Sequence, residues 1–209
     1  PAERVVGAFL PAGTNAVWVT APGPHFGPTF ARFRIHSGAA ALQPTGLASD
    51  GEVEDYTVWI DPAPVPPDPL AKWWQSPDLT LNGMDVCATQ PYLLADDFLC
   101  TSRSAITNIV VWGSWRSDLI PGDPGNAVFF LSVHSDIPAV VGGPPSKPGE
   151  LLWLQAFTPG SYGVALERDG LHEGWYNPAT QEYVPWSVPG DSLCFRYTFP
   201  VPLGAEFVQ

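Results

Sequence analysis

Three acidic side chains at alternate positions are the residues of this sequence best placed to do chemistry. Asp50, Glu52 and Glu54 lie in the string ASDGEVEDYTVWI, which runs directly into a strand-like series of apolar residues. Because side chains alternate between the two sides of an extended chain, the three carboxylates are expected on one side. Oxygen ligands of this kind suit Ca²⁺. A Ca²⁺ site is therefore one interpretation of the string.

Two other interpretations of this acidic string stay open. Arg32 and Arg34 in the preceding segment TFARFRIH could neutralise the carboxylates, since like charges at neighbouring positions repel one another. The string could also be a solvated face without a ligand. In each case, the period of two places Val53 and Asp55 on the opposite side.

Catalytic motifs are not apparent in the rest of the sequence. Asp96 and Asp97 in LADDFLC are adjacent in a predicted strand and would point to opposite faces, which does not suit joint work on one glycosidic bond. The four His residues are scattered without zinc-site spacing, and there is no GxSxG elbow or glycine-rich phosphate loop. We therefore expect a protein that is not an enzyme, with no catalytic residues and no cofactor apart from Ca²⁺.

The composition is typical of an all-β protein. Twenty-five Pro and 20 Gly residues, with 12% aromatic residues, suit short strands joined by turns better than helices. The net charge of −12 disfavours binding to nucleic acid or anionic membrane surfaces, and no apolar run is long enough to span a bilayer. The sequence begins at Pro1 without Met or a signal peptide, which indicates a mature, trimmed or partial chain.

The cysteines and lysines bear on the compartment. Cys87, Cys100 and Cys194 allow one disulfide and one thiol. Cys100 and Cys194 both lie in strand-like segments, so this pair is favoured, with Cys87–Cys100 as the rival and three reduced, buried cysteines as the third interpretation. The chain has only two lysines, Lys72 and Lys147, which also indicates an extracellular location.

A proline-rich segment divides the sequence into two predicted β domains. Residues 61–69 (DPAPVPPDP) hold five prolines in nine positions, which exclude a sheet interior and favour a stiff polyproline II linker. Residues 1–60 contain four strand candidates, at 4–10, 15–20, 29–36 and 54–60. Residues 70–200 contain the seven or eight strands of a sandwich or jelly roll, at 93–100, 105–115, 126–137, 150–158, 162–168 and 191–199, with a hairpin at 174–186.

The first domain is expected to be incomplete on its own. Four strands over sixty residues bury little apolar surface and leave sheet edges without partners. Upstream chain, packing on the second domain, or a strand from a neighbouring subunit could each complete it.

Residues 5–60 resemble the closing part of a GEVED domain. The likeness rests on ARFR and on PTGLASDGEVEDY, which carries at residues 51–55 the run that names this family of β-sandwich modules. The acidic front portion usual in that family is absent. Residues 70–209, with LADDFLC, IVVWGSW and GDSLCFRYTF, are similar to an uncharacterised β module of secreted bacterial proteins. Together the resemblances imply an extracellular or cell-surface bacterial protein.

The C-terminal tail is the predicted assembly element. Val201, Leu203 and Phe207 fall at alternate positions, so residues 201–209 are predicted to form an apolar strand that another subunit can accept. Head-to-tail donation of this kind would build a filament. A last edge strand of the same domain, or a linker to a further module, is the alternative.

Two functions follow from these patterns. Trp73 and Trp74, beside the linker, are predicted to make a domain or subunit contact, because aromatic residues are enriched at interfaces. The sequence thus predicts a structural protein, the repeating subunit of a fibre or matrix built by β-strand pairing between copies. The alternative is a carbohydrate-binding accessory protein, in which Trp73, Trp74 or Trp175 would stack on the sugar rings of glycans.

Overall fold

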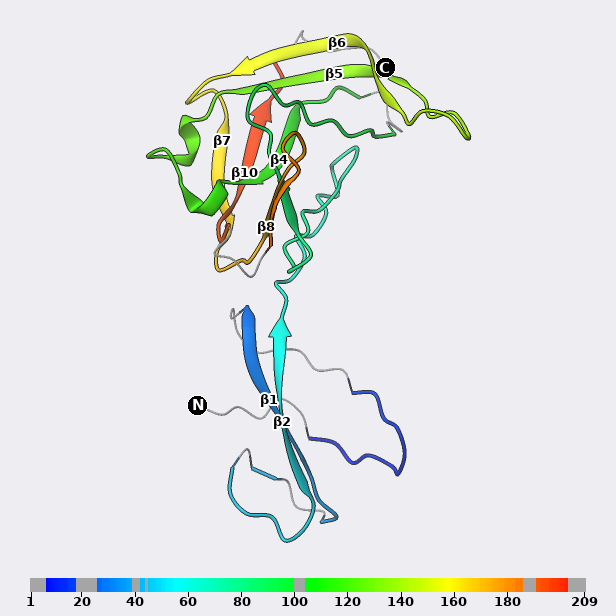
Figure 1. The fold of residues 1–209 in the computed structure, drawn as a ribbon, viewed down its shortest axis with the longest axis vertical. Coiled ribbons are helices and arrows are strands. Elements are labelled where there is room, and N and C mark those ends of the chain that lie inside the picture. Colours follow the sequence, from blue (N-terminus) through cyan, green and yellow to red (C-terminus); the bar gives the residue numbers. More distant parts are fainter. Residues whose placement is uncertain are drawn as a thin grey trace. The chain divides into compact units, whose positions relative to one another are not determined.

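The computed structural model describes residues 7–17, 26–38, 42–43, 45–99, 104–185 and 191–202. It divides into two compact units, Pro1–Pro62 and Ala63–Gln209. The described residues form strands, turns and two short 3-10 helices but no α-helix, so the predicted all-β class is confirmed (Figure 1). None of the described segments forms a helix long and apolar enough to cross a membrane.

The first unit contains one antiparallel pair of strands, β1 (Gly27–Ile35) and β2 (Glu52–Ile60). Gly27 faces Ile60 at one end of the pair and Ile35 faces Glu52 at the other. The predictions of strands at 29–36 and 54–60 are confirmed. Those at 4–10 and 15–20 are wrong where the structure describes them, because residues 7–10 and 15–17 are irregular.

The second unit contains three small sheets. The sheet β4-β10-β7 has β10 in its centre, β5 and β6 form a long hairpin, and β3 runs parallel to β8 in the sheet β3-β8-β9. The bounds are β3 Met84–Val86, β4 Asn108–Ser114, β5 Phe129–Ile137, β6 Lys147–Phe157, β7 Gly163–Arg168, β8 Gly174–Asn177, β9 Glu182–Val184 and β10 Cys194–Pro200, with 3-10 helices η1 Arg116–Asp118 and η2 Pro124–Asn126.

The main core of the second unit lies between the β5–β6 hairpin and the β4-β10-β7 sheet, which cross each other in Figure 1. The half-buried Phe129 of β5 packs against this core, with its ring centroid 4.9 Å from Tyr197, 5.0 Å from Phe199 and 5.2 Å from Tyr162. Period-two alternation in β10 supplies this packing, because Phe195, Tyr197 and Phe199 share one face. Two layers packed face to face give the sandwich-like arrangement that the sequence predicts.

Most of the strand predictions for the second unit are confirmed, in β4, β5, β6, β7, β10 and the β8–β9 hairpin. The predicted strand at 93–100 is wrong over its described part, since residues 93–99 are irregular. Strand β3 is missing from the predictions because its three residues are too few to show a period.

The proline-rich segment at 61–69 is divided between the units. The boundary falls at Pro62, inside the predicted linker. Val65 is buried in a second, smaller core cluster with Leu79, Leu171 and Cys194. Ser76 Oγ donates a hydrogen bond to the Val65 carbonyl oxygen at 2.8 Å. Residues 63–69 of the predicted linker therefore belong to the second unit, where Val65 packs in a core cluster, and they do not form a separate extended spacer.

Candidate functional site

The β1–β2 pair carries an ion pair on one of its two faces. Arg32 and Asp55 are direct cross-strand partners, and the guanidinium donates to both carboxylate oxygens at 2.7 Å. This bidentate contact lowers the pKa of Asp55 and raises the pKa of Arg32 from their ordinary values. Both groups are exposed, so the pair adds little to the stability of the strands.

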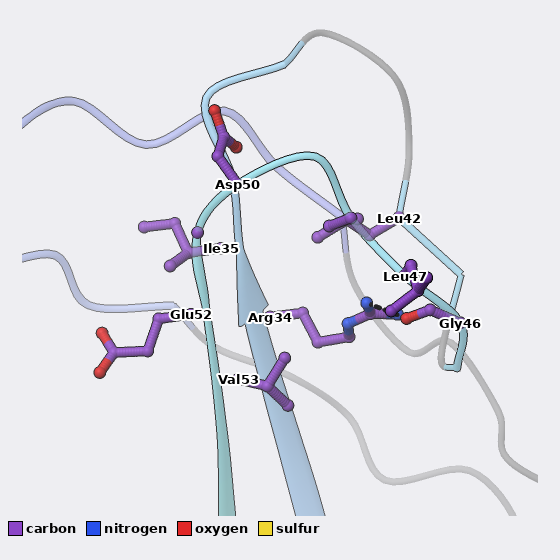
Figure 2. A pocket seen from close by; sticks show the side chains of 10 residues that line it. Arg34, Ile35, Leu42, Gly46, Leu47, Asp50, Glu52 and Val53 are labelled. Carbon is purple, nitrogen blue, oxygen red and sulfur yellow. Dashed lines mark hydrogen bonds between the residues drawn. The ribbon is translucent and has the colours of Figure 1, made fainter.

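A second set of contacts closes the connection between β1 and β2. Arg34 donates to the carbonyl oxygens of Gln43 at 2.5 Å and Gly46 at 2.6 Å. Asp50 accepts hydrogen bonds from the backbone N–H and the hydroxyl of Ser37, and these lower the pKa of Asp50. Arg34, Gly46 and Asp50 help to line a pocket of about 260 Å³. Figure 2 shows Arg34 reaching toward Gly46 while Glu52 points away from the guanidinium.

The predicted Ca²⁺ set is not assembled. Glu52 and Glu54 share one face, as the alternation predicts, but their cross-strand partners there are Ile35 and Phe33. Asp50 lies before β2 and is held by the loop. Across the described residues, no three His, Cys, Asp or Glu side chains are arranged to hold a metal ion. The structure therefore does not bring Asp50, Glu52 and Glu54 together, and Ca²⁺ binding at these residues stays a prediction.

Large apolar side chains remain exposed on both faces of this strand pair. Phe30 is 80% exposed, Phe33 60% and Ile35 61%. Phe33 packs edge-on against Tyr56, at 5.6 Å between ring centroids. Neither core cluster of the described residues includes a side chain from β1 or β2, and no described strand pairs with their outer edges. We call these two strands, with their faces and outer edges, the ribbon surface.

The residues predicted to mediate assembly differ in their placement. Val201 is 7% exposed, packs in the main core and donates its backbone N–H to Thr107 at 2.9 Å. Val201 thus belongs to the core of its own unit, which corrects its assignment to a donated tail. Leu203 and Phe207 lie outside the described residues.

The two tryptophans beside the linker also differ. Trp74 packs against Trp112 in the smaller core cluster and donates to Ser76 Oγ at 2.9 Å. Trp73 is 44% exposed, and its ring lies 5.9 Å from that of Phe98. Of the predicted pair, Trp73 is therefore the more accessible side chain, and its contact with another domain or subunit stays a prediction.

The cysteines and the acidic pair of LADDFLC are the remaining residues that the sequence analysis considered as candidates. Cys194 is a buried thiol, and burial raises its pKa to about 12. Its predicted partner Cys100 lies outside the described residues, so the Cys100–Cys194 disulfide stays a prediction. Asp96 and Asp97 are exposed in an irregular segment, where the Asp97 N–H donates to Asp96 Oδ1 at 2.9 Å.

A buried carboxyl cluster in the second unit was missed by sequence reasoning. Asp85 comes from β3, Glu173 lies just before β8, and Asp191 is bridged to Glu173 through the backbone. Ser114 Oγ donates to Glu173 Oε2 at 3.1 Å, and the Ser117 N–H donates to Asp191 Oδ1. The signal is weak in the sequence because the three acids are far apart and each stands alone in its segment.

Burial governs the titration of this carboxyl cluster. Desolvation, followed by the charge of Asp191, raises the pKa of Asp85 to about 7. Desolvation, followed by the charge of Asp85, raises the pKa of Glu173 to about 8. The pKa of Asp191 is also raised, chiefly by burial. Carboxyl groups with a raised pKa carry protons under conditions in which exposed ones are charged.

Comparison with known proteins gives a family for the second unit. No curated protein and no solved structure matches the chain. One family model matches residues 71–209, which is more than half of the chain and includes the carboxyl cluster and both core clusters except Val65. The chain therefore belongs to the family described as a domain of unknown function (DUF7901).

Proposed function

We propose that this protein is a non-enzymatic structural protein of the bacterial cell surface or extracellular matrix. In this proposal it is the repeating subunit of an assembly in which the ribbon surface of one copy pairs with a strand from another. The low lysine content, the acidic charge and the GEVED-like motif at 51–55 support the extracellular setting. The observation that carries the assembly itself is the ribbon surface.

The ribbon surface has the two properties that strand addition requires. Among the described residues no strand pairs with its outer edges, so an added strand could bond to backbone N–H and C=O groups there. Its apolar side chains, Phe30, Phe33 and Ile35, are exposed and would be covered by a second layer. Full burial of each would contribute about 1.5–3 kcal/mol, which offsets part of the free-energy cost of association.

We propose that the strand added to the ribbon surface comes from a second copy of this chain. The predicted donor is the segment at 203–209, with Leu203 and Phe207 at alternating positions, since Val201 is held in the core of its own unit. Donation between copies leaves the donor segment and the acceptor ribbon in different subunits, so the contact propagates head to tail. An upstream segment of a longer chain would cover the same surface within one molecule and would leave the protein monomeric.

The test is the size of the full chain in solution. We expect sedimentation velocity to show species that grow with protein concentration, and electron microscopy to show filaments. Phe33→Ser should abolish them, because it removes an exposed apolar side chain of the ribbon surface. Phe130→Ser is the matched control, since Phe130 is a similarly exposed phenylalanine on β5 of the second unit.

A deletion tests the predicted donor, residues 203–209, separately from the ribbon surface that would accept it. Removal of residues 203–209 spares the buried Val201 and should dissolve the assemblies. Assemblies that survive the deletion but not Phe33→Ser would exclude the tail as donor. A wild-type chain that stays monomeric at every concentration would contradict the proposal as a whole.

A carbohydrate-binding function is the second candidate, and the exposed pair of Trp73 and Phe98 favours it. Flat aromatic rings at a surface can stack on sugar rings. If this function holds, the soluble chain binds an insoluble polysaccharide and Trp73→Ala releases it. Leu70→Ala, at an exposed apolar position nearby in the sequence, serves as the control. Equal retention of both variants would contradict it.

A further inference from the structure

The carboxyl cluster of Asp85, Glu173 and Asp191 joins three separate parts of the second unit. Asp85 belongs to β3, and Glu173 leads into β8. Asp191 contacts the η1 segment through the Ser117 N–H and the β8 side through its backbone bridge with Glu173. These contacts link the β3-β8-β9 sheet to the 3-10 turn after β4 and to the chain entering β10. The state of the cluster therefore affects how this part of the fold is held together.

The cluster has fewer hydrogen-bond donors than its oxygens require. Asp191 is 1% exposed and Glu173 4%, yet Asp85 Oδ2 and Asp191 Oδ2 are buried without a hydrogen-bond partner. Asp191 is among the groups that raise the pKa of Asp85, and the Asp85 side chain in turn affects the pKa of Asp191. Two ionised carboxylates cannot donate to one another, so a contact between them is favourable only when one carries a proton.

The ion pairs of the described residues lie outside the cluster. The guanidinium of Arg116, the cation nearest in sequence to Ser117, instead pairs with Glu182 at 2.6 Å and covers the ring of Trp175.

The other ionisable groups on the surrounding elements are mainly acidic. The charges of Asp78 and Asp118 also act on the cluster. Asp118 itself receives the N–H groups of Ser192 and Leu193, both at 3.0 Å. On the remaining elements around the cluster, the ionisable residues are Glu167 and Arg168 at the end of β7, His172 before β8, Tyr176 in β8, Glu182 and Tyr183 in β9, and Cys194, Arg196 and Tyr197 in β10. Of these, Arg196 pairs with Glu167 at 3.7 Å.

We propose that Asp85, Glu173 and Asp191 bind and share protons in the folded protein, forming a pH-sensitive lock between β3, η1 and the segment that enters β10. With a proton shared, the facing carboxyl groups hydrogen-bond and hold these elements together. When the proton is lost, two or three negative charges share one buried site and repel one another. The second unit then loosens on the alkaline side.

The direction of the pH response follows from the raised pKa values. In the unfolded chain these carboxyl groups titrate near about pH 4. In the folded protein the pKa is about 7 for Asp85 and about 8 for Glu173. Between these limits the folded state holds more protons than the unfolded state. The stabilising effect of the cluster is thus complete below about pH 4 and is lost as the pH rises to about 8.

The test is thermal unfolding of the full chain from about pH 5 to about pH 9 in the presence of a chelator. Tryptophan fluorescence follows the second unit, which contains seven of the nine tryptophans. We expect Tm to fall by roughly 5 °C or more across this range. Asp191→Asn should flatten the profile and raise Tm above wild type at the alkaline end. The reason is that an amide is uncharged and keeps its N–H donors at every pH in this range. Asp169→Asn, at an exposed position, should leave the profile unchanged.

Two further measurements keep the proposal testable if that variant does not fold. Glu173→Gln should flatten the profile in the same direction. Infrared difference spectra of wild type should show a protonated carboxyl band that persists at neutral pH and disappears at the alkaline end. A wild-type Tm that is flat or rises with pH, or a spectrum without that band, would overturn the proposal. So would a rise in Tm on adding Ca²⁺ at high pH that Asp191→Asn abolishes, because the cluster would then be a metal site.

Discussion

The two units hold their acidic side chains in opposite ways. In the first unit, Asp55 and Asp50 are exposed and accept hydrogen bonds from Arg32 and Ser37, which lower the pKa of both carboxyl groups. In the second unit, burial raises the pKa of each carboxyl group in the cluster. The same residue type thus makes a contact that acid weakens in one unit and a contact that base weakens in the other.

The apolar side chains show the same contrast. Phe199 of β10 is completely buried, whereas Phe30 of β1 is largely exposed. The second unit packs two layers around its aromatic residues, while the described part of the first unit is a single layer. A single two-stranded layer is marginal in water, so the first unit gains most from a partner.

The largest expected effect comes from exchanging a phenylalanine for alanine in each unit. Phe199→Ala should lower the free energy of unfolding of the second unit by about 3–5 kcal/mol, because it leaves a cavity in the main core. Phe30→Ala should change the stability of the monomer by less than about 0.5 kcal/mol. Urea unfolding followed by fluorescence and circular dichroism measures both values. Similar losses would show that the first unit has a core of its own.

The next effect concerns the glycine that begins the GEVED-like run. Gly51 has φ of 102°, and an added Cβ would collide with the carbonyl oxygen of Ile35. Gly51→Ala should therefore cost the β1–β2 pair roughly 1–3 kcal/mol or more. Amide exchange of Glu52–Ile60 reports the loss.

The matched control for Gly51→Ala is in the second unit. Gly160 has φ of 83° but open space around its Cβ position, so Gly160→Ala introduces backbone strain without the collision. It should have the smaller effect on its own unit. If Gly51→Ala leaves amide protection of the strand pair unchanged, the approach to Ile35 is not what closes the hairpin.

A smaller effect is expected from a polar contact in the core of the second unit. Trp115 Nε1 donates to the hydroxyl of the buried Tyr197 at 3.1 Å. Tyr197→Phe should reduce the stability of that unit by about 1 kcal/mol, because the indole N–H loses its acceptor while the ring remains. Chemical denaturation measures the change, with the exposed Tyr183→Phe as control. A neutral result would indicate that water replaces the lost contact.

The smallest effect is the acid response of the first unit. Because Arg32 lowers the pKa of Asp55, the ion pair contributes at pH values above about 4 and is lost as the pH falls through the pKa of the folded state. Asp55→Asn should therefore remove the acid-induced rise in amide exchange of the strand pair. Asp61→Asn, an exposed carboxyl just after β2, should retain it. An identical acid response in all three proteins would contradict this role of Arg32.

The strands that could be predicted from the sequence are those with a clear period. In β10, the alternation of Phe195, Tyr197 and Phe199 identifies both the strand and its buried face. In β1 and β2, the alternation predicts that Glu52 and Glu54 share a face, but it does not predict their cross-strand partners. Those partners depend on the strand register, and the register depends on the loop between β1 and β2, which contains Gly51 and is held by Arg34. The segment LADDFLC shows the limit of the method, because its apolar residues are exposed in an irregular stretch.

The carboxyl cluster could not be predicted in the same way. Asp85, Glu173 and Asp191 meet only because β3 pairs with β8 and residue 173 bridges residue 191. Val201 was assigned to a tail for a related reason: its alternation with Leu203 continues the pattern of β10, and the sequence does not mark where the core ends. Long-range pairing decides both cases, and local pattern carries no information about it.

Hydrogen exchange of the ribbon surface in assembled and monomeric fractions tests the central claim most directly. If a strand from a second copy pairs with this surface, the outer-edge amides of β1 and β2 exchange rapidly in the monomer and slowly in the assembly. Equal exchange in the two fractions, or a chain that forms no assembly at any concentration, would contradict the claim.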